Sequence, residues 1–409
     1  MSEPSPDTPL GNRRRFTFQG NLRDTRHGWL RLTPAYSVHL VRERLAELGR
    51  DHMPVLDPFS GTGTTLLACA EQGLPGDAVD LNPFLVWLAR AKLARYPAPA
   101  REKARKLVAR MVRSALGRSP AQPWLPPLHR IDRWWEPETL AALGRAFAAL
   151  GESDAPPRIV DLARVSFCRA LIDCANVSFG HQSMSFKQSD GTAGGKKRVA
   201  LALERALESV LPAAAEPLGR GPRRVVLGDS RRLDKALPRR RYGAVITSPP
   251  YPNRMSYIRE LRPYMYWLGY LEDRKSAGEL DWQAIGGTWG AATSRLSTWK
   301  PTRPRQELPE LERIAAEIAE QSPLLAAYVR KYFFDMAGHV ERLVPRLARG
   351  GTLAYVVGNS KFYDTLLPVE QLFATLFERA RLVNVDIEVL RKRTSKRELF
   401  EYCVTARRP

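Results

Sequence analysis

Cysteine is scarce in this sequence, and long apolar runs are missing. The 409 residues include Cys69, Cys168, Cys174 and Cys403, whose spacing fits neither a disulfide scaffold nor a zinc site. No stretch reaches 18 apolar residues, and residues 1–20 lack the apolar core of a signal peptide. These absences argue against a secreted disulfide-rich protein and a helical membrane protein. We expect a cytoplasmic protein with no metal and no membrane partner.

Acidic residues are also few. The chain carries 43 Asp and Glu against 64 Lys and Arg, which gives a formal net charge of +21 at pH 7. Basic side chains release condensed counterions from phosphates, so a nucleic acid is the expected partner. A generally arginine-rich proteome is the alternative explanation. Hydrophobic residues make up 44% of the chain, which is ordinary for a folded, enzyme-sized protein.

The pattern of short apolar runs predicts an α/β fold. Runs at 54–57 and 76–80 are each followed by a helical pattern, at 64–72 and 83–94, which is typical of a parallel sheet. A further helix is expected at 33–48, and further strands at 224–229, 244–248, 352–357, 382–390 and 399–405. The region 97–220 does not continue this alternation of strands and helices, so we expect an insertion rather than a separate core. Within it, the expected core residues are Trp124, Trp134 and Trp135.

A glycine-rich motif joins the first strand to the following helix. It reads Asp57-Pro58-Phe59-Ser60-Gly61-Thr62-Gly63-Thr64-Thr65. Open α/β sheets bind ligands at this end of a strand, where glycines allow close backbone approach and helix N–H groups bind anions. The motif lacks the Gly-Lys-Ser/Thr ending of a phosphate loop. Leu66 stands where a dinucleotide fingerprint has its third glycine.

An acidic residue ends the second strand. Asp80 follows Asp57 by 23 positions, a spacing that suits a carboxylate accepting hydrogen bonds from ribose hydroxyls. A helix N-cap is its alternative role. The neighbouring Asn82, Pro83 and Phe84 place polar and flat groups beside the expected nucleoside. The two strand ends together predict a nucleoside-containing ligand.

A second motif, Thr247-Ser248-Pro249-Pro250-Tyr251, ends a later strand. The two motifs together resemble those of the nucleic-acid amino-methyltransferases, whose cofactor loop reads Asp-Pro-Phe-x-Gly-x-Gly-Thr-Thr and whose catalytic tetrapeptide reads Ser/Asn/Asp-Pro-Pro-Tyr/Phe/Trp. The resemblance implies a Rossmann-like methyltransferase fold with a seven-stranded, mostly parallel sheet, helical and irregular insertions, and S-adenosyl-L-methionine as cofactor. Serine at the first catalytic position resembles the cytosine-N4 branch. The order of the motifs, cofactor loop first, departs from the permuted order common in that branch.

The resemblance also implies a division of the chain and a set of cofactor residues. The division is a flexible basic arm (1–25), a cofactor-binding half (26–96), an insertion for target recognition (97–221), a catalytic half (222–270), a second insertion (271–330) and the C-terminal part of the sheet (331–409). In the family, the counterparts of Thr33 and Tyr36 close over the methionine half, and that of Asp229 accepts from the adenine amino group. The candidate cofactor-binding residues are Thr33, Tyr36, Asp57, Pro58, Phe59, Gly61, Gly63, Thr64, Thr65, Asp80, Asn82, Asp229 and Thr247.

The expected catalytic residues are Ser248, Pro249, Pro250 and Tyr251. An exocyclic amino nitrogen is a poor nucleophile because its lone pair is delocalised into the ring. Acceptors for the amino hydrogens, the Ser248 hydroxyl and the Pro249 carbonyl, localise that pair and stabilise the charge of the transition state. The two prolines stiffen the loop, and Tyr251 is expected to stack on a base taken out of its helix.

Target recognition is expected from residues outside the sheet. The segment 176–198 mixes phosphate donors with aromatic residues, and two further candidates follow the catalytic motif. A solvated basic loop is the alternative for any single member. The candidate nucleic-acid-binding residues are His181, Gln182, Lys187, Lys196, Lys197, Arg198, Asn253 and Arg254.

These inferences favour methyl transfer to cytosine N4 in DNA. Adenine N6 in DNA is the nearest alternative, and an RNA base amine is the next. A non-catalytic nucleic-acid-binding subunit is a third reading, which the complete motifs disfavour. A cognate restriction nuclease or defence system is an expected partner.

Overall fold

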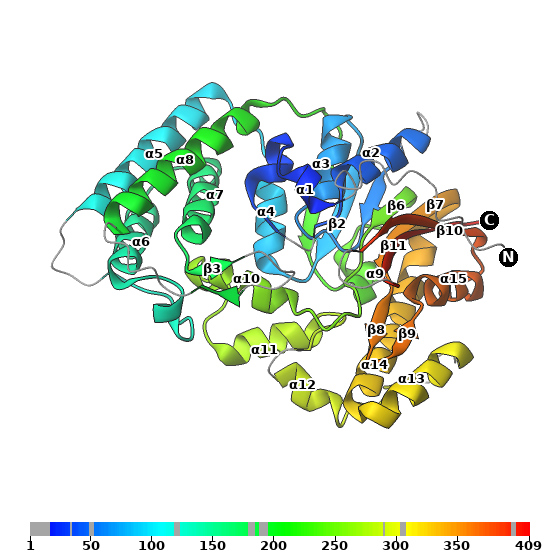
Figure 1. The fold of residues 1–409 in the computed structure, drawn as a ribbon. Helices are drawn as coiled ribbons and strands as arrows, with labels where there is room; N and C mark the ends of the chain where they lie inside the picture. Colours follow the sequence, from blue (N-terminus) through cyan, green and yellow to red (C-terminus); the bar gives the residue numbers. More distant parts are fainter. Residues whose placement is uncertain are drawn as a thin grey trace.

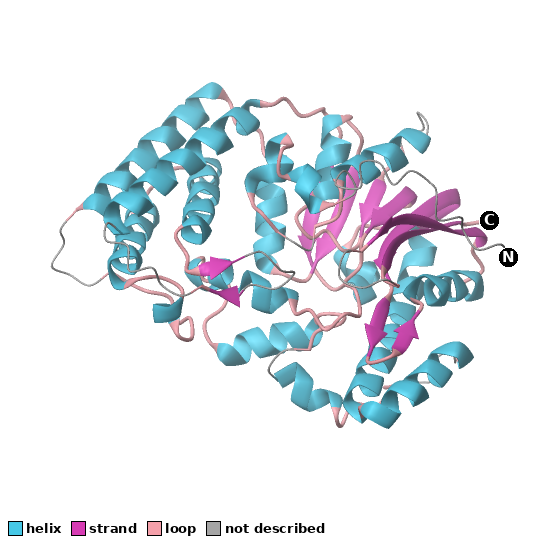
Figure 2. Ribbon diagram, in the orientation of Figure 1, coloured by secondary structure: helices cyan, strands magenta, loops and turns pink. Residues whose placement is uncertain are grey.

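A seven-stranded sheet carries helices on both faces in the computed structural model, and a layer of long helices stands beside it (Figure 1, Figure 2). The structure describes residues 17–32, 35–48, 53–117, 123–178, 185–187, 195–288, 291–302, 308–393 and 398–409. The strands of the sheet are β1 (Val55–Asp57), β2 (Gly76–Asp80), β5 (Arg223–Leu227), β6 (Tyr242–Thr247), β7 (Leu347–Gly358), β10 (Val383–Lys392) and β11 (Phe400–Arg407).

The strand order creates a ligand-binding crevice. From one edge to the other the order is β10, β11, β7, β6, β1, β2, β5. β1 pairs parallel with β2 on one side and with β6 on the other, so the chain order reverses at β1. Only β11 among these seven runs opposite to the rest, antiparallel to both β7 and β10. This arrangement confirms the Rossmann-like methyltransferase fold class, and such a reversal opens a crevice outside the carboxyl ends of the strands.

Apolar side chains alternate along the strands and bury both faces of the sheet. Val55 packs in a cluster with Val41, whereas its neighbour Leu56 packs in another cluster with Phe333. Consecutive strand residues point to opposite faces, which explains the two clusters. The covering helices are α2 (Val38–Glu47), α3 (Thr64–Glu71), α4 (Pro83–Leu93), α14 (Pro323–Leu343) and α15 (Val369–Arg379).

The region after α4 forms a helical layer with an apolar core. Its long helices are α5 (Ala98–Leu116), α6 (Pro137–Gly151), α7 (Pro157–Asp173) and α8 (Gly195–Ala215). The core extends into α4 and α10 (Tyr257–Trp267), so the layer is packed onto the sheet domain. Trp134 and Trp135 are buried in it, as expected. The expectation for Trp124 is wrong, because that side chain is 52% exposed and stacks on Phe147.

Shorter elements connect these parts. None of the helices in the described ranges is long and apolar enough to cross a membrane. The remaining elements are α1 (Phe18–Asn21), η2 (Thr25–Trp29), η3 (Ile131–Arg133), β3 (Val177–Ser178), β4 (Ser185–Phe186), η4 (Ser230–Arg232), α9 (Leu233–Ala236), α11 (Arg274–Gln283), α12 (Ala291–Leu296), α13 (Pro309–Gln321), η5 (Val344–Arg346), β8 (Ser360–Phe362) and β9 (Thr365–Leu367).

The helix expected from residue 33 begins at Val38 instead. Ser37 is its N-cap, and the Ser37 side chain accepts from the backbone of His39. The buried Asn21 side chain donates to the Tyr36 carbonyl and accepts from the Val38 N–H, at 2.8 Å each. The tertiary contact from Asn21 therefore fixes the helix start. It also packs part of the expected flexible arm into the fold.

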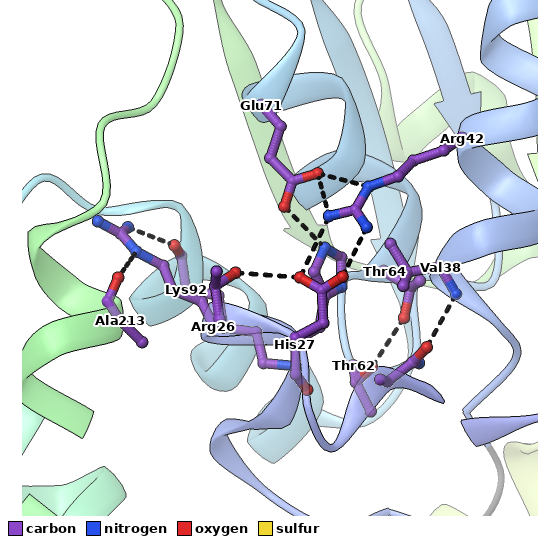
Figure 3. Close-up of polar contacts among 12 residues, drawn as sticks. Arg26, His27, Val38, Arg42, Thr62, Thr64, Glu71, Lys92 and Ala213 are labelled. Carbon is purple, nitrogen blue, oxygen red and sulfur yellow. Dashed lines mark hydrogen bonds and ion pairs between the residues drawn. The ribbon is translucent and has the colours of Figure 1, made fainter. Parts of the chain in front are cut away.

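A buried arginine ties the N-terminal segment to two helix ends (Figure 3). Arg26 is 2% exposed, and its guanidinium donates to five backbone carbonyls at 2.6–3.0 Å. These carbonyls lie at the C-terminal ends of α4 and α8, where helices leave acceptors without partners and favour a cation. They belong to Lys92, Ala94, Ala213, Ala214 and Glu216.

We expect Arg26→Lys to lower the free energy of unfolding by about 3 kcal/mol, because a single ammonium group leaves several buried carbonyls without donors. Urea unfolding measures this loss. The control is Arg95→Lys, since Arg95 is exposed and donates to two carbonyls at 3.3 and 3.4 Å. Equal stability of the two variants would show that Arg26 does not hold the helix ends.

Candidate active site

A cleft opens at the carboxyl ends of β1, β2, β5 and β6. Its open space is about 1000 Å³ with the solvent at its mouth included. Both sequence motifs reach it. The predicted site residues that line it are Tyr36, Pro58, Phe59, Gly61, Thr64, Asp80, Asn82, Asp229, Ser248 and Pro250.

The glycine motif forms a tight loop between β1 and α3. Gly63 is the N-cap of α3 and has a left-handed φ of 80°. A Cβ at this position would lie 2.8 Å from the Cβ of Ala89 in α4. Gly61 also has a positive φ, 49°. The loop thus needs glycine both for its backbone conformation and for close packing of α3 on α4.

Asp80 links the glycine loop to the next strand end. Its carboxylate accepts from the Gly61 N–H at 2.7 Å and from the Asn82 N–H at 2.8 Å. The Asn82 side chain in turn caps α4 by accepting from Phe84. Burial raises the pKa of Asp80 to about 7, although the hydrogen bonds from Asn82 and Gly61 act in the opposite direction. The carboxylate borders the cleft and is a ready acceptor for hydroxyl donors.

Asp57 lies beneath the cleft and holds the two motifs together. It is fully buried and accepts from the Thr247 hydroxyl at 2.6 Å and from the Phe59 N–H at 3.1 Å. Burial raises the pKa of Asp57 to about 6 against the hydrogen bond from Thr247. Thr65 donates to the Ile246 carbonyl and contacts the Tyr36 hydroxyl. Asp57, Thr65 and Thr247 therefore position the loops without lining the cleft.

A buried histidine supports the aromatic wall of the cleft. The His339 ring contacts Phe59 edge-on, with centroids 4.7 Å apart. Its Nε2 lies 2.6 Å from the Tyr355 hydroxyl, and its Nδ1 lies 3.0 Å from the Ser230 carbonyl. Burial lowers the pKa of His339 to about 4, so the ring is neutral near pH 7. No sequence motif marks His339, because its partners come from three distant segments.

Asp229 belongs to an ion-pair network at the other end of the cleft. It accepts from the backbone and the guanidinium of Arg231 at 2.8 and 2.9 Å. Arg231 also pairs with Asp335 at 2.9 Å and donates to the Gln283 carbonyl at 2.6 Å. Asp335 pairs with Lys331 at 2.7 Å. The network anchors α11 and α14 around Asp229.

The second motif forms a loop that hydrogen bonds to β7 and α14 hold in place. The Ser248 hydroxyl donates to the Val356 carbonyl at 3.1 Å, which leaves its lone pairs available as acceptors. The Pro250 carbonyl accepts from the Tyr332 hydroxyl at 2.7 Å. Within the described ranges, no hydrogen bond involves the carbonyl of the buried Pro249. Ser248 and Pro250 line the cleft, whereas Pro249 is buried between them and does not belong to the lining.

The ring of Tyr251 lies beside the cleft lining. Its hydroxyl donates to a Glu401 carboxylate oxygen at 2.9 Å. The ring packs so closely on Gly358 that a Cβ there would lie 2.9 Å from a ring carbon, and the Arg393 guanidinium lies 5.8 Å from the ring centroid. Burial and the Glu401 charge raise the pKa of Tyr251 well above its ordinary value. Tyr251 is a rigid platform anchored to β11.

The predicted nucleic-acid contacts are spread over different parts of the fold. Arg254 is exposed shortly after the second motif, and the Asn253 side chain accepts from the Met255 N–H there. Lys196, Lys197 and Arg198 lie in the first turn of α8, in the helical layer. Lys187 is exposed beside β4. Thr33, His181 and Gln182 lie outside the described residues.

Several apolar residues that sequence reasoning missed complete the cleft. Leu85 comes from α4, Ile258 and Leu261 from α10, and Ala284 and Ile285 follow α11. Their helical spacing is that of ordinary core residues, so only the packing of α10 and α11 against the sheet reveals them. They supply apolar walls suited to an aromatic ring.

One group of potential metal ligands occurs within the described part of the chain, away from the cleft: Asp24, His27 and Glu71 (Figure 3). The Arg42 guanidinium pairs with Asp24 at 2.5 Å and with Glu71 at 2.8 Å. His27 lies 3.2 Å from the other Glu71 oxygen. Because the Arg42 guanidinium bridges both carboxylates, the group is an ion-pair network that fixes the N-terminal segment to α3.

The sheet order and the glycine-loop cleft define a Rossmann-like fold with a ligand site at its topological switch point. The sequence is similar over short segments to curated Type II methyltransferases. M.AvaI of Nostoc sp. is 32% identical over 74 residues, 18% of this chain and 15% of the relative. M.BsoBI of Geobacillus stearothermophilus is 32% identical over 79 residues, 19% and 16%. M.MjaII of Methanocaldococcus jannaschii is 43% identical over 42 residues, 10% and 8%.

These alignments support similarity to Type II methyltransferases over short stretches only, since they span less than a fifth of each relative's length. No family model matches the sequence. A solved rRNA methyltransferase, aviRa from Streptomyces viridochromogenes, covers 91% of this chain and 86% of its own at 14% identity, with a TM-score of 0.31. A score this low carries no argument about fold or function.

Proposed function

We propose that this protein is an S-adenosyl-L-methionine-dependent methyltransferase that acts on an exocyclic amino group of a nucleobase, with cytosine N4 in DNA as the preferred target. One observation carries the proposal. Ser248 and Pro250 of the second motif line the same cleft as Gly61 and Asp80 of the cofactor loop, although the motifs are far apart in the sequence.

The cleft has the groups that this cofactor requires. Asp80 is an acceptor for the ribose hydroxyls, and the apolar walls around Phe59 and Ile285 suit the adenine ring. The first turn of α3 borders the cleft at Thr64 and presents backbone donors suited to the carboxylate. Tyr36 lines the cleft beside this turn. When bound, the cofactor supplies an electrophilic methyl group on its sulfonium sulfur.

The second motif then holds the target amino group. The Ser248 hydroxyl oxygen and the Pro249 carbonyl accept the two amino hydrogens, which concentrates the lone pair on nitrogen. The amino nitrogen held there would accept the methyl group from the bound cofactor, which would leave with the electron pair of its methyl–sulfur bond, and the nitrogen would release one proton toward solvent. Tyr332 and Val356 keep the loop in place through their hydrogen bonds, so little reorganisation precedes the transfer.

The choice of a nucleic acid as substrate rests on the net charge of +21, and the choice of DNA rests on the similarity to Type II methyltransferases. The choice of cytosine rests on the serine at position 248. The alternative targets are adenine N6 in DNA and an amino group of a base in RNA. A cognate restriction nuclease stays a prediction.

Product analysis tests the proposal. The protein is incubated with methyl-labelled S-adenosyl-L-methionine and either unmethylated genomic DNA or total RNA, and the nucleosides are separated by mass spectrometry. N4-methylcytosine from DNA is the expected product. Only N6-methyladenine would overturn the target base, label only in RNA would overturn the polymer, and absence of label together with absence of cofactor binding in calorimetry would overturn the activity.

Cofactor affinity should depend on pH through Asp80. Its pKa is raised to about 7 in the free protein, and ribose hydroxyl donors favour the charged carboxylate. Affinity is therefore nearly full at pH 8 and falls as Asp80 is protonated through pH 7, by about tenfold from pH 8 to pH 6. Calorimetry across this range measures the change. Asp80→Asn should bind weakly and lack this change between pH 8 and pH 6, and an unchanged profile in that variant would assign the titration to another group.

A further inference from the structure

A second, strongly basic groove lies beside the candidate active site. Its open space is about 1170 Å³ with the solvent at its mouth included. It contains five arginines and one histidine, and no carboxylate belongs to the described residues of its lining. Figure 1 shows α10 between the sheet and the helical layer, close to β3 and α11. The residues of this basic groove are Leu128, His129, Arg130, Arg133, Trp134, Phe186, Arg259, Arg262, Tyr266, Arg274 and Gly278.

Aromatic rings hold two of the arginines in place. The Arg133 guanidinium lies 4.3 Å from the centroid of the Phe186 ring. The Arg262 guanidinium lies 5.1 Å from the centroid of the buried Trp134 ring. Stacking of this kind restricts the position of the guanidinium group.

The other cations crowd around an exposed histidine. Desolvation and the positive charges of Arg274, Arg130 and Arg262 all lower the pKa of His129. Arg130, Arg259 and Arg274 are themselves exposed. The nearby carboxylates, Asp132, Glu260 and Asp273, lie outside the groove lining and influence its edges.

One helix connects the basic groove to the active-site cleft. Ile258 and Leu261 of α10 line the cleft, whereas Arg259 and Arg262 line the groove. Successive helix residues differ by about 100°, so the two sites occupy adjacent faces of the same helix. A polymer in the groove therefore passes within a few residues of the catalytic loop.

We propose that the basic groove binds the phosphodiester backbone of the substrate nucleic acid on the helical-layer side of the target nucleotide. The identity of this polymer as substrate rests on the proposed function. Guanidinium groups bind phosphate oxygens bidentately, and neutralised phosphates release counterions. None of the described residues that line the groove is among the nucleic-acid contacts predicted from the sequence at 181–198 and 253–254. Phe186 lies within the first of these ranges but was not itself a predicted contact.

The test uses Arg130→Gln/Arg259→Gln/Arg274→Gln in the full chain. Fluorescence anisotropy measures its affinity for a labelled DNA duplex and for the matching RNA duplex over a range of salt concentrations. We expect the dissociation constant to rise at least about tenfold near physiological salt, and the slope of log affinity against log salt to decrease in magnitude by about 2–3. The expected loss for both polymers reflects their common phosphates; loss for one polymer alone identifies it as the ligand of the groove.

A matched control removes the same charge elsewhere. Arg105→Gln/Arg158→Gln/Arg205→Gln changes exposed arginines on the outer faces of α5, α7 and α8, and should leave affinity and salt slope close to wild type. Equal affinities and salt slopes of the two triple variants would overturn the proposal that this groove binds nucleic acid. Absence of binding of either polymer by the wild type would also overturn it. If the wild type transfers no methyl group but the groove variant still loses nucleic-acid binding, the proposed function is overturned and the proposed role of the groove is retained.

Discussion

Replacing Ser248 by alanine should lower kcat about 100- to 1000-fold and leave cofactor affinity within about threefold of wild type. The Ser248 hydroxyl donates to the Val356 carbonyl, and in the proposed mechanism its lone pairs accept an amino hydrogen without reorganisation. Alanine has no acceptor for the amino hydrogen, and the charge that develops on nitrogen loses its stabilisation. Single-turnover methyl transfer to DNA and calorimetry with the cofactor measure the two quantities.

The control for this variant is Ser297→Ala. Ser297 is exposed, and its hydroxyl also donates to a backbone carbonyl, that of Ser294 at 2.8 Å, but it does not line the cleft. It should retain wild-type turnover. A loss of less than about fivefold in Ser248→Ala would remove the hydroxyl from the mechanism. A large loss of cofactor affinity would instead assign Ser248 to cofactor binding.

Gly63→Ala should destabilise the protein by roughly 2–5 kcal/mol and weaken cofactor binding at least about tenfold. Gly63 has a φ of 80°, which costs energy for any residue with a Cβ. The added Cβ would also lie 2.8 Å from the Cβ of Ala89, which forces α3 away from α4. Because the cofactor loop leads into α3, this shift changes the site. Urea unfolding and calorimetry measure both effects.

Gly269→Ala separates the two causes. Gly269 has a similar φ, 74°, but nothing lies within 4 Å of a Cβ built there. This variant should lose only about 1 kcal/mol and bind the cofactor as the wild type does. If both variants behave alike, backbone strain explains the result, and the packing of α3 on α4 has no part in the site.

Local sequence signals identified most of the sheet and the cofactor loop. The strand predicted at 76–80 has the observed bounds Gly76–Asp80, and the helix predicted at 64–72 ends one residue earlier, at Glu71. Both segments have strong apolar patterns and punctuation by glycine or a capping residue. Such signals depend on neighbours in the chain, which a sequence displays directly.

Signals that depend on distant residues were misread or absent. The helix expected from 33 starts at Val38 because Asn21 binds the backbone on both sides of Ser37. Trp124 and Trp134 lie in similar tryptophan- and proline-containing sequence, yet Trp124 is 52% exposed because it packs at the edge of the helical layer. Neither outcome follows from periodicity, since each depends on which surface the fold places opposite the residue.

The sequence by itself determined the fold class and the two loops with their acceptors and glycines. Tertiary structure alone brought Ser248 and Asp80 into the lining of one cleft, placed His339 against Phe59, and gathered the arginines of the basic groove. The physical reason is the range of the interactions. Turns, caps and alternation are fixed within a few residues, whereas a cleft is formed by surfaces whose positions depend on the packing of the whole sheet and its helices.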